Sequence, residues 1–364
     1  MKALKKHAYA PDYAVPPGET LQEVMESLGM TQRELAMRTG LTVQSLNRIF
    51  KGEQPISYDT AARLELVTGT PARFWNNLEL NYQERLTAIQ EQARLKEDLV
   101  WLKKMPTREL IKRGAMPAAA AGTELLRQTL RFYGVSSVAA WTELWERPAV
   151  AARRSPCFES HPGPASAWLR LGELQAGAQI CKPYNEASFR ELLPQIRTLT
   201  REKPEVYLTK LPELCAACGV AIAIIEGMDK VPWSGATRWL TPEKVMILLS
   251  LRGKGEDKFW FSFFHEACHV LHDSKKELLI NDGGTADPRE LRAEKFAADT
   301  LIPPDCDPII RAAAGRPDIQ LIADELEVSP AIIAGRYQHL TAKWSWFKDM
   351  IRPLSGADFV LAQA

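Results

Sequence analysis

The chain of 364 residues is long enough for two or three domains, and 46% hydrophobic with 25% charged residues is typical of a globular protein. Six cysteines are too few for a disulfide scaffold, no apolar run has the length of a membrane span, and no apolar stretch follows the basic N-terminus. We therefore expect a cytoplasmic protein without a signal peptide or a membrane partner. The formal net charge of +1 indicates no class of partner.

Proline and glycine positions divide the chain into five predicted parts. In chain order these are a flexible arm, a helical domain, a helical connector region, a core and a C-terminal helical cap, over 1–15, 16–82, 83–200, 201–305 and 306–364. In the connector region, 116–122 and 147–165 are rich in alanine, glycine or proline, and we expect loops or hinges there with a helix over 123–145 between them.

Two short helices are predicted in the helical domain. Thr31 can cap the first, because Glu34 follows at the spacing of a capping box. Gly40 ends this helix with the residue that best tolerates a left-handed conformation. Thr42 can cap the second helix, in which apolar residues recur at helical spacing. These inward-facing apolar residues are Val43, Leu46, Ile49 and Phe50.

The second helix leaves a polar set of residues on its open side. They are Gln44, Ser45, Asn47, Arg48 and Lys51. Short amides, a hydroxyl and an arginine near a helix N-terminus suit the reading of base edges in a DNA major groove. Two short amphipathic helices also occur in helical domains that bind no DNA, so the pattern alone leaves both interpretations open.

A resemblance favours the DNA-binding interpretation. The stretches Thr31 to Ala36, Gly40 to Thr42, Asn47 to Ile49 and Gly52 resemble the Cro/cI-type helix-turn-helix family. Pro17 to Glu19, Gly69 to Pro71 and Phe74-Trp75 resemble its HigA-type antitoxin branch, so that the match covers about 16–82.

The resemblance implies binding to double-stranded DNA. Gln32 would contact phosphate, and the second helix would approach the bases with Gln44, Ser45, Asn47 and Arg48, flanked by Thr42 and Lys51. Residues 1–75 hold nine Lys and Arg against eight Asp and Glu, so we expect modest affinity for phosphate and a homodimer on the DNA.

From about residue 185 the apolar periodicity becomes mixed. We predict helices near 187–198, 205–218, 258–273 and 288–301, strands at 220–225, 236–240 and 245–251, and a helical tail over 308–350. Asp257 can cap the helix near 258–273. The expected fold class is therefore multidomain, with an all-α N-terminal domain and an α+β second domain flanked by helices.

Residues 265–269 read His-Glu-Ala-Cys-His. On a helix, His265 and His269 lie one turn apart on one face and can share a zinc ion, and Glu266 can accept a proton from an attacking water. Lys275 stands where a metzincin has its third histidine, which excludes that class. His272 could also serve as the third ligand, but it lies about 10.5 Å along the helix from His265, which is a strained span for one ion. Glu290, which opens the next predicted helix, is the better candidate.

The sequence here is similar to the ImmA/IrrE family of metallopeptidases. The matching motifs lie between Gly219 and Pro304, and they are Ser234 to Trp239, Phe259 to Phe261, His265 to His272, and Glu290, Ala293, Phe296 to Ala298 and Leu301 to Pro303. The resemblance implies a zincin-like domain with Zn2+, or another divalent ion such as Mn2+, held by His265, His269 and Glu290. Glu266 would be the catalytic base, and the substrate would be a protein such as a repressor or a toxin-antitoxin partner.

Four further residues have weaker signals. The family usually has Asn or Asp where this chain has Glu294, and we expect Glu294, with His272, to lie around the ligands and orient a histidine. Cys215 and Cys218 have the spacing of a redox or metal pair, but no second pair is visible, which favours buried structural thiols.

The sequence is compatible with three functions. The first is a DNA-bound regulator with an active zinc-dependent endopeptidase domain. The second is a HigA-like antitoxin or repressor whose metal domain only senses or binds a partner, and the third has a purely structural zinc site. Glu266 favours the first, because a structural site has no use for a base.

Overall fold

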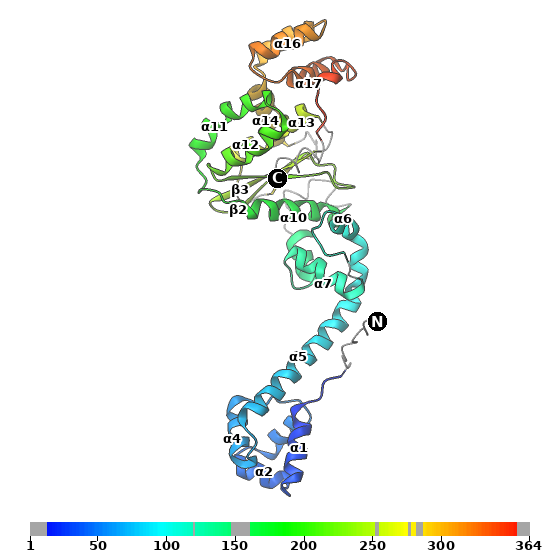
Figure 1. Cartoon of the computed structure of the whole chain (residues 1–364), viewed down its shortest axis with the longest axis vertical. Helices are drawn as coiled ribbons and strands as arrows, with labels where there is room; N and C mark the ends of the chain where they lie inside the picture. The colour runs from blue at the N-terminus through cyan, green and yellow to red at the C-terminus, as the bar shows by residue number, and fades with distance from the viewer. Residues whose placement is uncertain are drawn as a thin grey trace, which may run out of the picture. The chain divides into compact units, whose positions relative to one another are not determined.

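The computed structural model describes residues 13–118, 121–146, 161–251, 255–275, 278–281 and 287–354 (Figure 1). The chain forms two compact units, 1–99 with 121–126, and 100–120 with 127–364. Most of the predicted arm, over 1–12, and most of the loop predicted over 147–165 lie outside the described residues. No helix in the described ranges is both long and apolar enough to cross a membrane.

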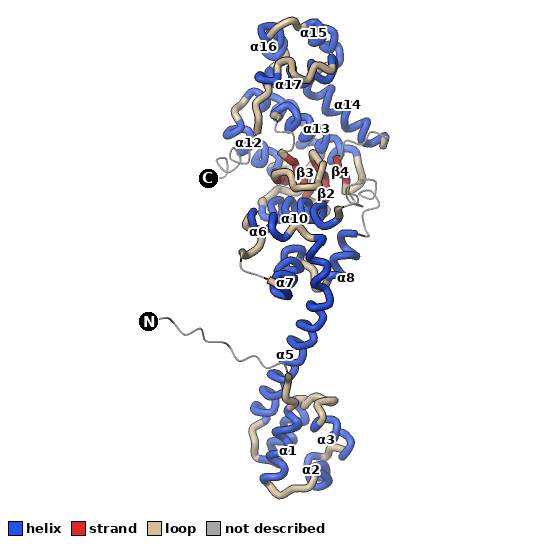
Figure 2. The backbone as a smooth tube through the Cα atoms, turned by 90° about the vertical axis from the view of Figure 1, so that its right-hand side faces the viewer, coloured by secondary structure: helices blue, strands red, loops and turns tan. Residues whose placement is uncertain are grey.

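The first unit is helical, as Figure 2 shows by colour. Its helices are α1 (Pro17–Ser27), α2 (Gln32–Thr39), α3 (Val43–Phe50), α4 (Tyr58–Thr68) and α5 (Ala72–Glu97). Their apolar faces meet in a core that contains Leu21, Leu35, Leu46 and Trp75, each of them fully buried. At Gly18 a Cβ atom would overlap the backbone of Ile49, so this glycine lets α1 pack directly on α3.

The predicted caps of α2 and α3 are confirmed. The Thr31 hydroxyl accepts a hydrogen bond from the Glu34 amide, and Gly40 ends α2 with φ 70°. The Thr42 hydroxyl accepts one from the Ser45 amide at 3.0 Å. The inward orientation predicted for Val43 is wrong, since its side chain is 42% exposed. Val43 is the first residue of α3 and lies at the exposed start of the helix.

A small helical region opens the second unit. It contains the 3-10 helix η1 (Asp98–Lys104), α6 (Thr107–Lys112), α7 (Gly122–Tyr133), α8 (Val138–Trp141) and the π-helical turn η2 (Thr142–Glu146). The first residues of η1 and α7 belong to the first unit. The predicted helix over 123–145 is therefore interrupted. Edge-on ring contacts join Trp101, Tyr133, Trp141 and Trp145 into one aromatic cluster.

The sheet of the second unit has four strands. They are β1 (Val220–Ile225), β2 (Gly235–Thr241), β3 (Lys244–Ser250) and β4 (Leu279–Asn281), in the order β1-β3-β2-β4. β1 runs parallel to β3, whereas β2 is antiparallel to both β3 and β4. The first three strands lie where the apolar runs predict them. β4 was not predicted, because three residues are too short to show a periodic pattern.

Helices cover both faces of this sheet. α10 (Pro162–Ala178) packs on β1 and β3 from one face, and α12 (Pro204–Ala216) and α13 (Glu256–His272) pack on the other, as Figures 1 and 2 show. Helix α10 falls in the stretch that the sequence suggests as connector, but it forms part of this layered core. At Gly172 a Cβ atom would lie 2.6 Å from the Leu248 side chain, so the glycine allows α10 to approach β3.

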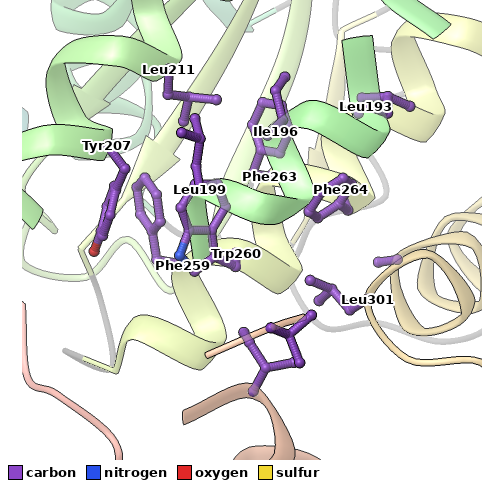
Figure 3. Packing of buried hydrophobic residues seen from close by; sticks show 14 of the residues in the cluster. Leu193, Ile196, Leu199, Tyr207, Leu211, Phe259, Trp260, Phe263, Phe264 and Leu301 are labelled. Atoms are coloured by element: carbon purple, nitrogen blue, oxygen red, sulfur yellow. The ribbon is translucent and has the colours of Figure 1, made fainter. Parts of the chain in front are cut away.

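The largest core cluster lies between α12, α13 and the sheet. Figure 3 shows Tyr207, Leu211, Trp260 and Phe263 packed there. α11 (Glu186–Thr198), η4 (Leu199–Arg201) and α14 (Pro288–Leu301) border it. Helix α13 begins at Glu256 with Gly255 as its N-cap, so the predicted cap by Asp257 is wrong. Asp257 lies within the first turn instead.

The predicted helical tail consists of several short elements. They are η5 (Pro304–Cys306), α15 (Asp307–Ala312), α16 (Arg316–Glu325), α17 (Pro330–Thr341) and η6 (Lys348–Met350). Helix α17 packs on α13, α15 and α16. A helical N-terminal region followed by a mixed domain with a small sheet is the predicted fold class, which is thus confirmed.

Candidate functional site

Helices α13 and α14 bring three donor side chains together. The Nε2 atoms of His265 and His269 lie 3.1 Å apart. Glu290, in the first turn of α14, places Oε2 3.0 Å from His265 Nε2 and Oε1 3.4 Å from His269 Nε2. Among the described residues, one group of three His, Cys, Asp or Glu side chains has all its donor atoms within 4.8 Å of one another, and it consists of these three residues.

The spacing of these atoms fits a divalent ion. Tetrahedral bonds of about 2.0–2.1 Å to nitrogen and oxygen separate the ligand atoms by roughly 3.3 Å. The observed separations of 3.0–3.4 Å have that size. Two imidazoles and one carboxylate are also the donors of catalytic zinc sites that keep a fourth position open. The residues present therefore fit a metal ion.

A carboxylate directly after α13 orients one of the histidines. The Nδ1–H of His269 donates to Asp273 Oδ2 at 2.8 Å, and Arg292 donates to the other Asp273 oxygen at 2.6 Å. This contact fixes the tautomer that leaves His269 Nε2 free to bind a metal. The Nδ1 of His265 is buried without a hydrogen-bond partner in the described structure. Asp273 thus supports one of the two histidines.

The sequence suggests Glu294 and His272 for this supporting role. Glu294 lies on α14 one turn after Glu290, and no hydrogen bond joins it to either histidine among the residues described. His272 is exposed at the end of α13 and its ring faces Phe296 at 6.1 Å. Asp273 was missed, although it stands four residues after His269, the spacing at which helical side chains meet.

The charges of the cluster favour a cation. Burial works to lower the pKa of His269, but hydrogen bonds to Asp273 and Glu290 outweigh it and raise this pKa to about 10. Burial likewise works to raise the pKa of Glu290, but hydrogen bonds from His265 and His269 lower it to about 2. Glu290 is therefore ionised across the physiological range, as a metal ligand must be.

Strand β2 determines where Glu266 lies. The Glu266 side chain is fully buried, and its Oε2 accepts a hydrogen bond of 2.7 Å from the Thr237 hydroxyl. A Cβ atom on Gly235 would lie 2.5 Å from Glu266 Oε1, so the glycine leaves room for the carboxylate. Burial raises the pKa of Glu266. Gly235 and Thr237 lie in one of the matching family motifs, but the sequence alone suggests no role for them.

The predicted polar face of α3 is largely exposed. Gln44, Asn47, Arg48 and Lys51 are exposed, as is the capping Thr42. Ser45 is partly buried, and its hydroxyl accepts a hydrogen bond from the Gln54 side chain at 2.7 Å. Gln32, at the start of α2, uses its amide nitrogen on Asn47 Oδ1 and on the Val43 carbonyl.

The cysteines add no second donor cluster in the described part of the chain. Cys215 and Cys218, at the end of α12 and just before β1, are buried free thiols. Burial raises the pKa of both thiols. Cys268, between the two histidines in sequence, is also buried, and burial raises its pKa to about 11. Thiols with raised pKa values are poor nucleophiles, so these cysteines serve as packing residues.

Sequence comparison identifies the class of each region. Residues 21–75 match the helix-turn-helix family model, which covers most of α1, all of α2 to α4 and the start of α5. Residues 228–337 match the model of the IrrE N-terminal-like domain, a peptidase family, and this match includes the donor cluster. A search of curated proteins found no match to the chain. The chain thus combines a helix-turn-helix domain with an IrrE-like, metallopeptidase-type domain.

Proposed function

We propose that the protein is a DNA-binding transcription regulator whose IrrE-like domain is a zinc-dependent endopeptidase. The observation that carries the proposal is the convergence of His265, His269 and Glu290. The carboxylate of Glu266 follows His265 directly on α13. A structural metal site needs ligands alone, whereas a hydrolytic one also needs a base next to the metal.

The side chains divide the work of peptide hydrolysis. His265, His269 and Glu290 would hold Zn2+, or another divalent ion such as Mn2+, and Asp273 would orient His269. The bound ion would polarise the scissile carbonyl and lower the pKa of the attacking water. Glu266 would accept the proton of that water and deliver it to the leaving amine. Thr237 would hold the Glu266 carboxylate in place from β2.

The helix-turn-helix domain would bring the peptidase to DNA. The polar face of α3 presents Gln44, Asn47 and Arg48 to solvent, which is where a recognition helix contacts base edges. The near balance of basic and acidic residues over 1–75 favours a homodimer on double-stranded DNA, and the sparse cysteines favour a cytoplasmic protein. The resemblance of the second domain to the ImmA/IrrE family favours a repressor or a toxin-antitoxin partner as the protein that is cleaved.

The decisive experiment compares cells that carry the parent protein, Glu266→Gln and the control Glu213→Gln. Glutamine is nearly isosteric with glutamate but cannot accept a proton, so proteolysis should fall by about 10²–10⁴-fold while metal and DNA stay bound. Glu213 is an exposed residue of α12, and its substitution makes the same charge change without touching the site. A protein that accumulates only in the Glu266→Gln strain is the expected substrate.

The opposite result would favour the rival function. If no protein changes in abundance and regulation by Glu266→Gln equals that of the parent, the peptidase proposal fails. The metal domain would then be a sensor or partner-binding module of a HigA-like repressor. The complete burial of Glu266 is the observation that speaks for this rival, because a general base must reach water.

A further inference from the structure

The side chain of Gln32 links α2 to α3 through two hydrogen bonds. Its Nε2 donates to Asn47 Oδ1 at 2.8 Å and to the backbone carbonyl of Val43 at 3.3 Å. Both hydrogens of this amide are thereby used inside the protein. A DNA phosphate is an acceptor, and the remaining Oε1 of Gln32 cannot donate to it. The geometry therefore argues against the phosphate contact expected for Gln32.

The Val43 carbonyl fixes the polarity of this arrangement. A carbonyl oxygen can only accept, so the Gln32 atom that faces α3 must be the nitrogen. The Asn47 atom that meets this nitrogen must in turn be its oxygen. Asn47 is exposed, and its Nδ2 makes no hydrogen bond among the residues described. Asn47 consequently directs its two N–H groups outward, while its oxygen is turned toward Gln32.

An asparagine that is free to use both amide atoms pairs with adenine, which presents N7 as acceptor and N6–H as donor in the major groove. Guanine presents two adjacent acceptors there, N7 and O6, and no donor. An outward donor without an acceptor matches guanine and opposes the N6–H of adenine. The neighbours Arg48 and Lys51 also carry donors only.

We propose that Gln32 is a positioning residue that fixes Asn47 as a pure donor, so that Asn47 reads guanine instead of adenine. This inference rests on the proposed DNA-binding function. It predicts the chemistry of one base pair in the operator, and it assigns Gln32 to specificity without contact with the DNA.

The test is a selection of bound sequences from a pool of random duplexes by the full chain. Asn47→Ala identifies the operator position that Asn47 reads, because sequence preference is lost there alone. At that position the parent should prefer guanine over adenine on the order of tenfold. Gln32→Glu removes the donor, so Asn47 turns its N–H groups to the new carboxylate and exposes Oδ1. The preference should move to adenine or cytosine, which carry donors.

Two controls keep the result interpretable. Gln22→Glu adds the same charge on the exposed face of α1 and should retain guanine. If Gln32→Glu lowers the melting temperature of the domain, Gln32→Ala replaces it, and guanine and adenine should then be selected about equally, since the Asn47 amide can rotate.

The outcomes separate the inference from the function on which it rests. Adenine at the Asn47-dependent position of the parent, or guanine retained in Gln32→Glu, overturns the inference alone. Asn47→Ala without any change in the selected sequence also overturns it. A parent protein that enriches no sequence overturns the proposed DNA-binding function together with the inference.

Discussion

Helices α3 and α13 both carry functional side chains on one face, yet they depend on different kinds of support. The polar atoms of α3 lie in solvent. The start of this helix is fixed by Thr42, whose hydroxyl accepts a hydrogen bond from the Ser45 amide three residues later. On α13, His265 and Glu266 are buried, and their partners Glu290 and Thr237 lie 25 and 29 residues away along the chain. A surface that reads another molecule can be built locally, whereas a buried reactive site needs several elements of the fold.

The largest effect is expected when α13 loses a partner that is distant in sequence, the metal ligand Glu290. The purified protein should carry about one divalent ion per chain, and Glu290→Ala should lose most of it because two histidines alone hold zinc weakly. His272→Ala should keep its metal, since that ring lies at the exposed end of α13. Elemental analysis of both variants decides, and metal loss in His272→Ala alone would refute the ligand set.

The carboxylate behind His269 should have an intermediate effect. Asp273→Asn keeps the size of the side chain but removes the charge that orients His269 and offsets Arg292. Such supporting residues typically contribute 10–100-fold in metal affinity. Competition with a chelator measures the loss. Asp299→Asn, which breaks an exposed ion pair with Lys295 on α14, is the control. Equal affinities of the two variants would deny Asp273 this role.

The role of β2 in placing Glu266 can be tested by filling the space that Gly235 leaves beside the Glu266 carboxylate. Gly235→Ala places a methyl group 2.5 Å from Glu266 Oε1. Overpacking of this kind costs about 1–3 kcal/mol of unfolding free energy. In Gly177→Ala on α10, nothing lies within 4 Å of the added carbon. The unfolding free energy of that variant should therefore rise by about 0.5–1 kcal/mol. Urea unfolding compares them, and a Gly235→Ala protein as stable as Gly177→Ala would mean that Glu266 moves freely.

The smallest effect is expected at the local support of α3. Thr42→Ala removes the hydroxyl that accepts from the Ser45 amide and should cost about 1 kcal/mol. Hydrogen exchange of the α3 amides should therefore accelerate, whereas Thr42→Ser keeps the cap and the protection. Loss of metal from Thr42→Ala would contradict the comparison, because it would couple a local cap to the distant site.

The sequence predicts features whose cause is local. The caps at Thr31 and Thr42, the end of α2 at Gly40 and the first three strands all follow from spacing and residue type within a few positions. The histidine pair on α13 is local in the same sense. Glu290 could be added because it opens the helix that follows, and its charge suits the donor set.

Other features depend on packing that no local pattern contains. The contacts of Thr237 and Gly235 with Glu266 arise only once β2 and α13 pack against each other. β4 forms because β2 offers an edge, not because its three residues favour a strand. Val43 is apolar at helical spacing, but at the first position of α3 it stays 42% exposed. Asp273 is the exception, since its i+4 spacing from His269 was visible.

The shortness of β4 has a consequence for solubility. It pairs with only Gly235, Ala236 and Thr237, so the described structure leaves the later residues of β2 without a strand on that side. An open strand edge invites pairing with another chain and, from there, aggregation. Lys275 lies 4.2 Å over the Trp239 ring, which places a positive charge on this stretch of β2. A charge in that place discourages a foreign strand from docking there, and so helps to keep a sheet with an unfinished edge from assembling with its copies.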